Sequence, residues 1–178
     1  MTEDKAARTR RKLSGGSVRI RAVTEADRDD VRRLCSAAHA ESYMRSVPIQ
    51  LDRVDRVLDH ILSDKTVDIG MVAESHRDGQ PRVVGLLHAT AGEHIYLDMI
   101  QASCLLFYVT PDHRRSTAAF QLMRHFIRRS LNSGAGSLSV HVSAGIRVRQ
   151  ADRFLKKMGF AHGGGNYQMM LDPKARGG

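Results

Sequence analysis

Apolar and polar positions in the first third of the chain predict one strand followed by two helices. Residues 18–23, VRIRAV, alternate apolar with basic side chains, which is typical of a half-buried strand. The TEAD sequence at 24–27 resembles a capping box, and apolar residues then recur at helical spacing as far as Ala38. Residues 51–62 predict a second amphipathic helix, whose outer face carries Asp52, Arg53, Asp55 and Arg56.

The middle of the chain contains a hairpin signal. Two apolar runs, 67–74 and 82–91, flank the polar segment SHRDGQP, and Asp78 with Gly79 is a favourable pair for the turn. Residues 93–101 are ambiguous, because they fit either a loop or a short strand.

The second half alternates strands and helices. The almost wholly apolar run 102–109 predicts a central strand, and 137–142 and 166–171 predict two more. Helices are predicted over 116–131 and over 147–158, where Gly159 ends the second one. The residues of the first helix expected to face inward are Phe120, Met123, Phe126, Ile127 and Leu131.

This order of elements predicts a single α/β domain over residues 18–172. Its front half is hairpin-linked and antiparallel, and a β-α-β crossover follows, so helices flank a mixed sheet. Residues 1–17 are polar, basic and rich in Gly and Ser, and we expect a disordered arm there. Residues 173–178 are expected to form a flexible tail.

Composition narrows the class of protein. The chain has 178 residues, of which 42% are apolar and 26% charged, as expected for a globular protein. We find no membrane span and no secretory signal, and expect a cytoplasmic protein. Cys35 and Cys104 lie in apolar patterns, which favours reduced core thiols over a disulfide framework. The nine histidines lack compact ligand spacing, so no metal is expected.

The net charge of +9 is unevenly distributed. The arm at 1–17 carries +3, and residues 111–131 alone carry +4. The second concentration favours an anionic ligand near the start of the predicted helix 116–131, although a solvated basic helix face remains an alternative.

The segment PDHRRSTAAF at 111–120 has features of a phosphate site. A helix start leaves backbone N–H groups without partners and carries the positive end of the helix dipole. Small residues at 116–119 let an anion approach the backbone, and Arg114 and Arg115 add positive charge. Ser116 and Thr117 are equally typical of ordinary N-capping, so the composition leaves both interpretations open.

Three segments resemble the GNAT N-acetyltransferase superfamily. YVTPDHRRSTAA is similar to its acyl-CoA loop, R/Q-x-x-G-x-G/A, with the pattern on Arg114, Thr117 and Ala119. ADRFLKKMGF at 151–160 resembles the family's late helix, and VVGLL, with Gly85, its third strand. The element order matches from residue 18 to 171, and the Arg-Arg loop is similar to that of some phage-encoded members.

The resemblance implies a fold and an activity. The expected sheet is splayed between its fourth and fifth strands, and the expected reaction moves an acetyl group from acetyl-CoA to a primary amine by direct attack. Pantetheine would lie along the fourth strand and pyrophosphate on the N–H groups of 115–119. The cofactor-binding residues that the resemblance implies are Phe107, Tyr108, Val109, Arg114, Arg115, Ser116, Thr117, Ala118 and Ala119.

The catalytic groups are less well indicated. His141, on the fifth predicted strand, is a candidate general base, although its alternation with valines also fits a solvent-facing residue. Tyr108 and Tyr167 are candidate proton donors to the departing thiolate. The chain departs from the family's pattern at Leu155, where many members have a tyrosine that protonates the thiolate, and at Thr117, the position of the first loop glycine.

Other positions and other functions remain open. Ser103 occupies the base position of some members and is no base, and loop residues that can act through water are Glu93, His94 and Asp98. A rival hypothesis is a nucleic-acid-binding module that uses the arm and the arginines of 111–131, or an acyltransferase for a nucleic-acid-linked amine. A degenerate fold kept for interaction is a third. The sequence leaves open which amine is the acceptor and whether the chain forms a homodimer.

Overall fold

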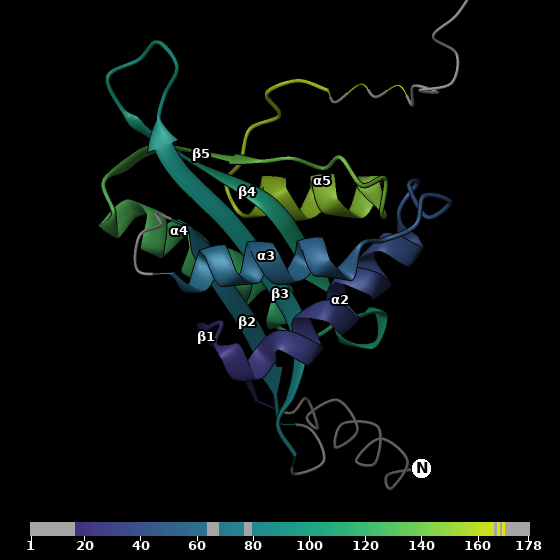
Figure 1. Ribbon diagram of the computed structural model, residues 1–178. Helices are drawn as coiled ribbons and strands as arrows, with labels where there is room; N and C mark the ends of the chain where they lie inside the picture. Colours follow the sequence, from purple (N-terminus) through teal and green to yellow (C-terminus); the bar gives the residue numbers. More distant parts are fainter. Residues whose placement is uncertain (1–16, 64–67, 77–79, 166, 168, 170–178) are drawn as a thin grey trace, which may run out of the picture.

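The computed structural model describes residues 17–165 except 64–67 and 77–79, together with residues 167 and 169 (Figure 1). Two short 3₁₀ helices, η1 (Glu25–Asp27) and η3 (Pro111–His113), accompany the longer elements. The helices are α2 (Arg28–Glu41), α3 (Leu51–Leu62), α4 (Ala118–Asn132) and α5 (Val148–Lys157). The strands are β1 (Val18–Ala22), β2 (Ile69–Ser75), β3 (Arg82–Glu93), β4 (Ile100–Val109) and β5 (Ala135–Val140).

The strands form one sheet in chain order, β1-β2-β3-β4-β5. The first four pair antiparallel, and β4 pairs parallel with β5 through the α4 crossover. Helices α2 and α3 cover one face of the sheet and α4 covers the other (Figure 1). The predicted single α/β domain with a mixed, largely antiparallel sheet is therefore confirmed.

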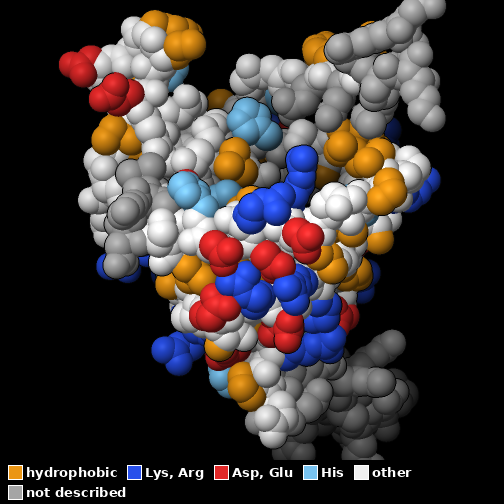
Figure 2. All heavy atoms as spheres, in the orientation of Figure 1, with side chains coloured by type: hydrophobic (Ala, Val, Ile, Leu, Met, Phe, Trp, Pro, Cys, Tyr) orange, Lys and Arg blue, Asp and Glu red, His pale blue; other side chains and the backbone are white. Residues whose placement is uncertain are grey.

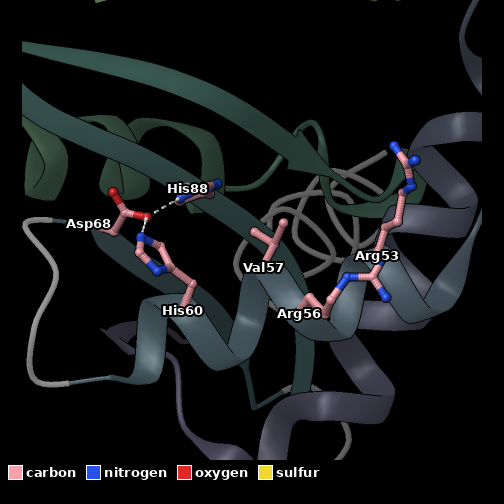
Figure 3. Close-up of a pocket in the computed structure, with 6 residues that line it drawn as sticks. All are labelled: Arg53, Arg56, Val57, His60, Asp68 and His88. Carbon is pink, nitrogen blue, oxygen red and sulfur yellow. Dashed lines mark hydrogen bonds and ion pairs between the residues drawn. The ribbon is translucent and has the colours of Figure 1, made fainter.

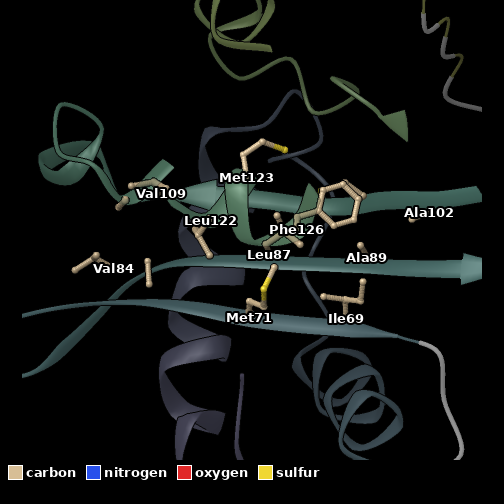
Figure 4. Packing of buried hydrophobic residues seen from close by; sticks show 13 residues of the cluster. Ile69, Met71, Val84, Leu87, Ala89, Ala102, Val109, Leu122, Met123 and Phe126 are labelled. Carbon is tan, nitrogen blue, oxygen red and sulfur yellow. The ribbon is translucent and has the colours of Figure 1, made fainter. Parts of the chain in front are cut away.

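Each face of the sheet has its own core, because successive strand residues point to opposite sides. On the α4 side, Leu122, Met123 and Phe126 are fully buried against residues of β2, β3 and β4 (Figure 4). The predicted inward positions Phe120 and Leu131 are wrong, since their side chains are 47% and 63% exposed. The inward stripe of α4 follows an i, i+4 spacing from Ala118, and both residues lie beside it.

A β-bulge on β4 marks the place where the sheet opens. His88 pairs with Leu106 and the next residue, Ala89, pairs with Cys104, so Leu105 is the extra residue on β4. Pairing between β4 and β5 ends at the same place, with Cys104 opposite Val140. Beyond this point the two strands part, which confirms the predicted splay.

The structure extends or leaves aside several predicted elements. The ambiguous residues 93–101 join β3 and β4 as the end of a long hairpin. The closing strand 166–171 lies mostly outside the described residues, and the two that are described, Tyr167 and Met169, lie in neither helix nor strand. The turn at 78–79, the arm before residue 17 and the tail at 173–178 also lie outside them.

The described part of the chain lacks two kinds of feature. None of its helices is long and apolar enough to cross a membrane. It contains no group of three or more His, Cys, Asp or Glu side chains arranged to hold a metal ion.

Candidate functional site

A cavity of about 370 Å³ occupies the space where β4 and β5 part, and we call it the splay cavity. Residues 104–109 of β4 form one wall, and residues 140–144 at and beyond the end of β5 form the opposite wall. The start of α4 contributes Ala119, and the inner side of α5 contributes Phe154 and Leu155. The cavity thus joins an unpaired strand edge to the N-terminus of a helix.

The backbone at the start of α4 still has donors to offer. Ser116 N–H donates to the His113 carbonyl at 3.0 Å, and Ala118 N–H donates to Ser116 Oγ at 3.1 Å. Within the described chain, the N–H groups of Arg115, Thr117 and Ala119 have no acceptor. Three N–H donors without an acceptor therefore lie at the positive end of the α4 dipole, as an anion site requires.

The two neighbouring arginines have different environments. Arg114 donates to the Val109 carbonyl at 3.0 Å and to Glu41 Oε1 at 2.7 Å, and its guanidinium lies 5.5 Å from the centre of the Tyr108 ring. Arg115 is exposed, lines the splay cavity and makes no ion pair with any described residue. Arg115 is therefore the cation available to a ligand, and Arg114 is held by the protein.

Glu41, the last residue of α2, also binds the candidate acid Tyr108. The Tyr108 hydroxyl donates to Glu41 Oε1 at 2.6 Å. Burial and this carboxylate raise the pKa of Tyr108 to about 12. Burial also opposes ionisation of Glu41, but the hydrogen bonds from Tyr108 and Arg114 outweigh it and hold the pKa of Glu41 below its usual value. Tyr108 must therefore leave Glu41 before it can protonate a thiolate.

The other predicted site residues are only partly brought together. His141 is exposed and lines the splay cavity just beyond the end of β5. Tyr167 is 98% exposed and is not part of the cavity lining. Phe107 stacks on Phe154 with 5.8 Å between ring centres. Ala118 is fully buried, so its small side chain serves the α4 core.

Val109 and Thr117 complete the predicted set. Val109 is buried and ends β4 at the cavity wall, where its carbonyl holds Arg114. Thr117 is exposed, and its hydroxyl accepts a hydrogen bond from the Gln121 side chain at 2.8 Å. The hydroxyl of Thr117 is thus bound along α4, and Thr117 is not part of the cavity lining.

Sequence patterns did not indicate several residues that line the cavity or contact its walls. Glu41 and Ala38 come from α2, which is remote in sequence from β4. Tyr43 N–H donates to the Ala144 carbonyl at 3.2 Å and ties the segment after α2 to the far wall. Arg147 has φ 47° and ψ 45°, a left-handed conformation that is uncommon outside glycine. No local motif identifies these residues, because they meet only through the tertiary fold.

The exposed face of α4 bears on the nucleic-acid hypothesis. Arg124, Arg128 and Arg129 are all exposed on this helix, and Arg124 stacks over Phe120 at 5.9 Å. The basic arm that would extend this surface lies outside the described residues. Nucleic-acid binding therefore stays a prediction.

The family of the chain follows from a match over its central region. The family model described as "Acetyltransferase (GNAT) family" matches residues 32–160, well over half of the sequence and all of the splay cavity's lining. The chain belongs to the GNAT acetyltransferase family. The predicted enzyme class is thereby confirmed, and members of this family take acetyl-CoA and an acceptor as substrates. No protein of curated function matches the chain.

Solved structures agree with the GNAT fold. A transcriptional regulator from Bacillus halodurans C-125 superposes with a TM-score of 0.69 at 21% identity, covering 87% of this chain and 100% of its own. Glucosamine-6-phosphate N-acetyltransferase from Arabidopsis thaliana gives 0.68 at 13%, covering 88% and 99%. Ribosomal-protein-alanine N-acetyltransferase from Brucella melitensis biovar Abortus 2308 gives 0.62 at 19%, covering 88% and 100%. At such identities the similarity supports the fold alone.

Proposed function

We propose that this GNAT protein transfers an acetyl group from acetyl-CoA to a primary amine by direct attack. The observation that carries the proposal is the splay cavity, which places an unpaired strand edge beside a helix start with three unpartnered N–H groups. The amine nitrogen forms a bond to the thioester carbon, the carbon–sulfur bond breaks, and the amine loses one proton. The products are an amide and CoA.

In this proposal each part of the cavity has a role. The N–H groups of Arg115, Thr117 and Ala119, with the Arg115 guanidinium, hold the pyrophosphate. Pantetheine lies along the open edge of β4, and a backbone N–H between Phe107 and Val109 stabilises the developing oxyanion. His141, at the cavity wall, is the candidate that takes the amine's proton.

The departing thiolate needs less help than an alkoxide would. Leu155 lines the cavity where many GNAT members have a tyrosine, so it presents an alkyl group to the leaving sulfur. A thiol has a pKa of about 8.5, so it can leave as thiolate and be protonated by water afterwards. Tyr108 lines the cavity and remains a candidate acid if its bond to Glu41 opens, and Tyr167 is placed less favourably.

Calorimetry with acetyl-CoA tests the proposal. We expect saturable binding and a higher melting temperature at millimolar acetyl-CoA, because the ligand binds the folded state. The same scan with duplex DNA is the control for the nucleic-acid hypothesis. Stabilisation by DNA with no heat of binding and no shift for acetyl-CoA would reject acetyl transfer in favour of that alternative.

A further inference from the structure

A second cavity, of about 380 Å³, opens on the surface between α3 and the sheet, and we call it the α3 groove (Figure 3). Its lining combines four residues of one helix with one from the segment before β2 and one from β3. These are Arg53, Arg56, Val57, His60, Asp68 and His88.

One end of the α3 groove is cationic. Arg53 and Arg56 are exposed, and neither makes an ion pair with a described residue. Asp55 and Asp59 of α3 are bound by arginines of α2, and Asp52, the residue before Arg53, makes no ion pair with either arginine of the groove. These ion pairs belong to a band of alternating acidic and basic side chains over α2 and α3 (Figure 2). Arg53 and Arg56 lie outside that network, and their positive charges are therefore available to a ligand.

The other end of the α3 groove holds a carboxylate. Asp68 Oδ2 lies 3.2 Å from His88 Nε2 and 3.6 Å from His60 Nε2, and only 9% of the Asp68 side chain is exposed. Burial opposes ionisation of Asp68, but hydrogen bonds from Thr90 and His88 outweigh it and hold its pKa below the usual value. An ionised carboxylate attracts an ammonium group to this end of the groove.

The carboxylate end of the groove adjoins the splay cavity. His88 on β3 is the direct cross-strand partner of Leu106 on β4, so the two side chains lie next to each other on the α2–α3 face of the sheet. Leu106 also lines the splay cavity. The groove and the splay cavity therefore meet at this pair of side chains, beside which an amine from the groove would reach the thioester.

We propose that the α3 groove binds the acceptor, and that this acceptor is an amine carrying a carboxylate or phosphate group. The anionic group binds Arg53 and Arg56, Val57 contacts the spacer, and the amine extends past Asp68 and His88 to the thioester beside Leu106. His60 lies one helical turn from Arg56 and two from Arg53, which corresponds to about 6 and 10 Å along α3. The inference rests on the proposed acetyl transfer and adds to it the class of acceptor.

Matched amines test the acceptor class by release of the CoA thiol. The probes are 6-aminohexanoate and 6-aminohexyl phosphate, compared with the neutral 6-aminohexanamide and the cationic 1,6-diaminohexane. We expect kcat/KM to be at least about tenfold higher for an anionic probe than for the amide, the value of a charge-assisted contact. A higher value for only one of the two anions identifies the group recognised. Equal values for all four probes, or a preference for the diamine, would overturn the inference.

Charge-removing variants locate the preference. The double variant R53Q/R56Q should lose it, so that kcat/KM for the anionic probes falls to about that for the amide, while the calorimetric affinity for acetyl-CoA is kept. The control, R128Q/R129Q, removes the same charge from exposed residues of α4 on the opposite face and should keep the preference. Preference retained in R53Q/R56Q would exclude these arginines as the anion site.

A binding measurement separates this inference from the proposed function. Imidazole signals of His60 and His88 are followed by nuclear magnetic resonance while 6-aminohexanoate or 6-aminohexyl phosphate is added, with and without CoA. Saturable shifts that the amide does not produce, and that R53Q/R56Q lacks, support the groove even if acetyl-CoA fails to bind. Shifts that are absent for both anions, or unchanged in R53Q/R56Q, reject the groove even if acetyl-CoA binds.

Discussion

The splay cavity and the α3 groove meet at the His88–Leu106 pair but differ in the chemical groups that line them. The splay cavity offers main-chain groups, namely an open strand edge and the start of α4, among mostly apolar side chains and a few basic ones such as Arg115. The α3 groove offers charged side chains at both ends. Main-chain N–H groups suit acetyl-CoA, which is the same molecule in every reaction of the family. Side chains can be exchanged in evolution, so they suit the selection of an acceptor amine. Substitutions should therefore act on the cavity by obstruction and on the groove by charge.

The largest effect should come from obstructing the splay cavity. Ala119→Glu places a carboxylate where the pyrophosphate is expected, and we expect acetyl-CoA affinity to fall by about 100-fold or more through bulk and like charge. Calorimetry measures the affinity, and a melting curve checks the fold. Phe120→Glu adds the same charge one residue later, outside the cavity lining, and should leave affinity nearly unchanged. A stable Ala119→Glu variant with normal affinity would refute the phosphate site.

A variant of the α3 groove should lower the stability of the fold without affecting the binding of acetyl-CoA. Asp68→Asn removes the charge that holds His60 and His88, and we expect a loss of about 1–3 kcal/mol in the free energy of unfolding at pH 7. Because folding lowers the pKa of Asp68, this stabilisation is present above the unfolded value and disappears as the pH falls through the folded one. Denaturant curves should therefore converge with those of the wild type below about pH 4. Acetyl-CoA affinity should not change.

A smaller effect is expected at the contact between α2 and β4. Glu41→Gln should lower the pKa of Tyr108 from about 12 while leaving it above the usual value, because burial of the ring remains. Ultraviolet titration of tyrosinate measures this, and Tyr108→Phe assigns the signal among the four tyrosines. We expect about 1 kcal/mol of lost stability, since the Glu41 side chain is 30% exposed. An unchanged Tyr108 titration would show that Glu41 does not hold this hydroxyl in solution.

The smallest effect should come from a main-chain position. Thr117→Gly removes a side chain that is not part of the cavity lining and keeps the N–H, so acetyl-CoA affinity should stay the same or rise slightly. The loss of the hydroxyl near the helix start should cost only a few tenths of a kcal/mol in stability. A clear fall in affinity would mean that the Thr117 side chain, and not the backbone alone, binds the donor.

The same contrast explains how far the sequence could predict the site. The segment from Val109 to Ala119 is continuous, so its small residues and arginines can be recognised in order. That order could not distinguish Arg114 from Arg115, because the partner of Arg114 comes from α2. The α3 groove assembles residues from α3, the segment before β2 and β3, and no periodicity links them. Glu41 could not be identified from the sequence for the same reason.

The extra residue of β4 has a consequence for insertions and deletions. Removing Leu105 would make the paired stretches of β3 and β4 equal in length. Cys104, Leu106 and Tyr108 would keep the faces to which they point, so the two cores would still form. The straightened strand could then continue its ladder with β5 past Cys104 and close the opening. Deletion of this single residue would thus yield a more regular sheet that no longer admits acetyl-CoA. Natural selection for catalysis would therefore keep the bulge at Leu105, although it makes the sheet less regular.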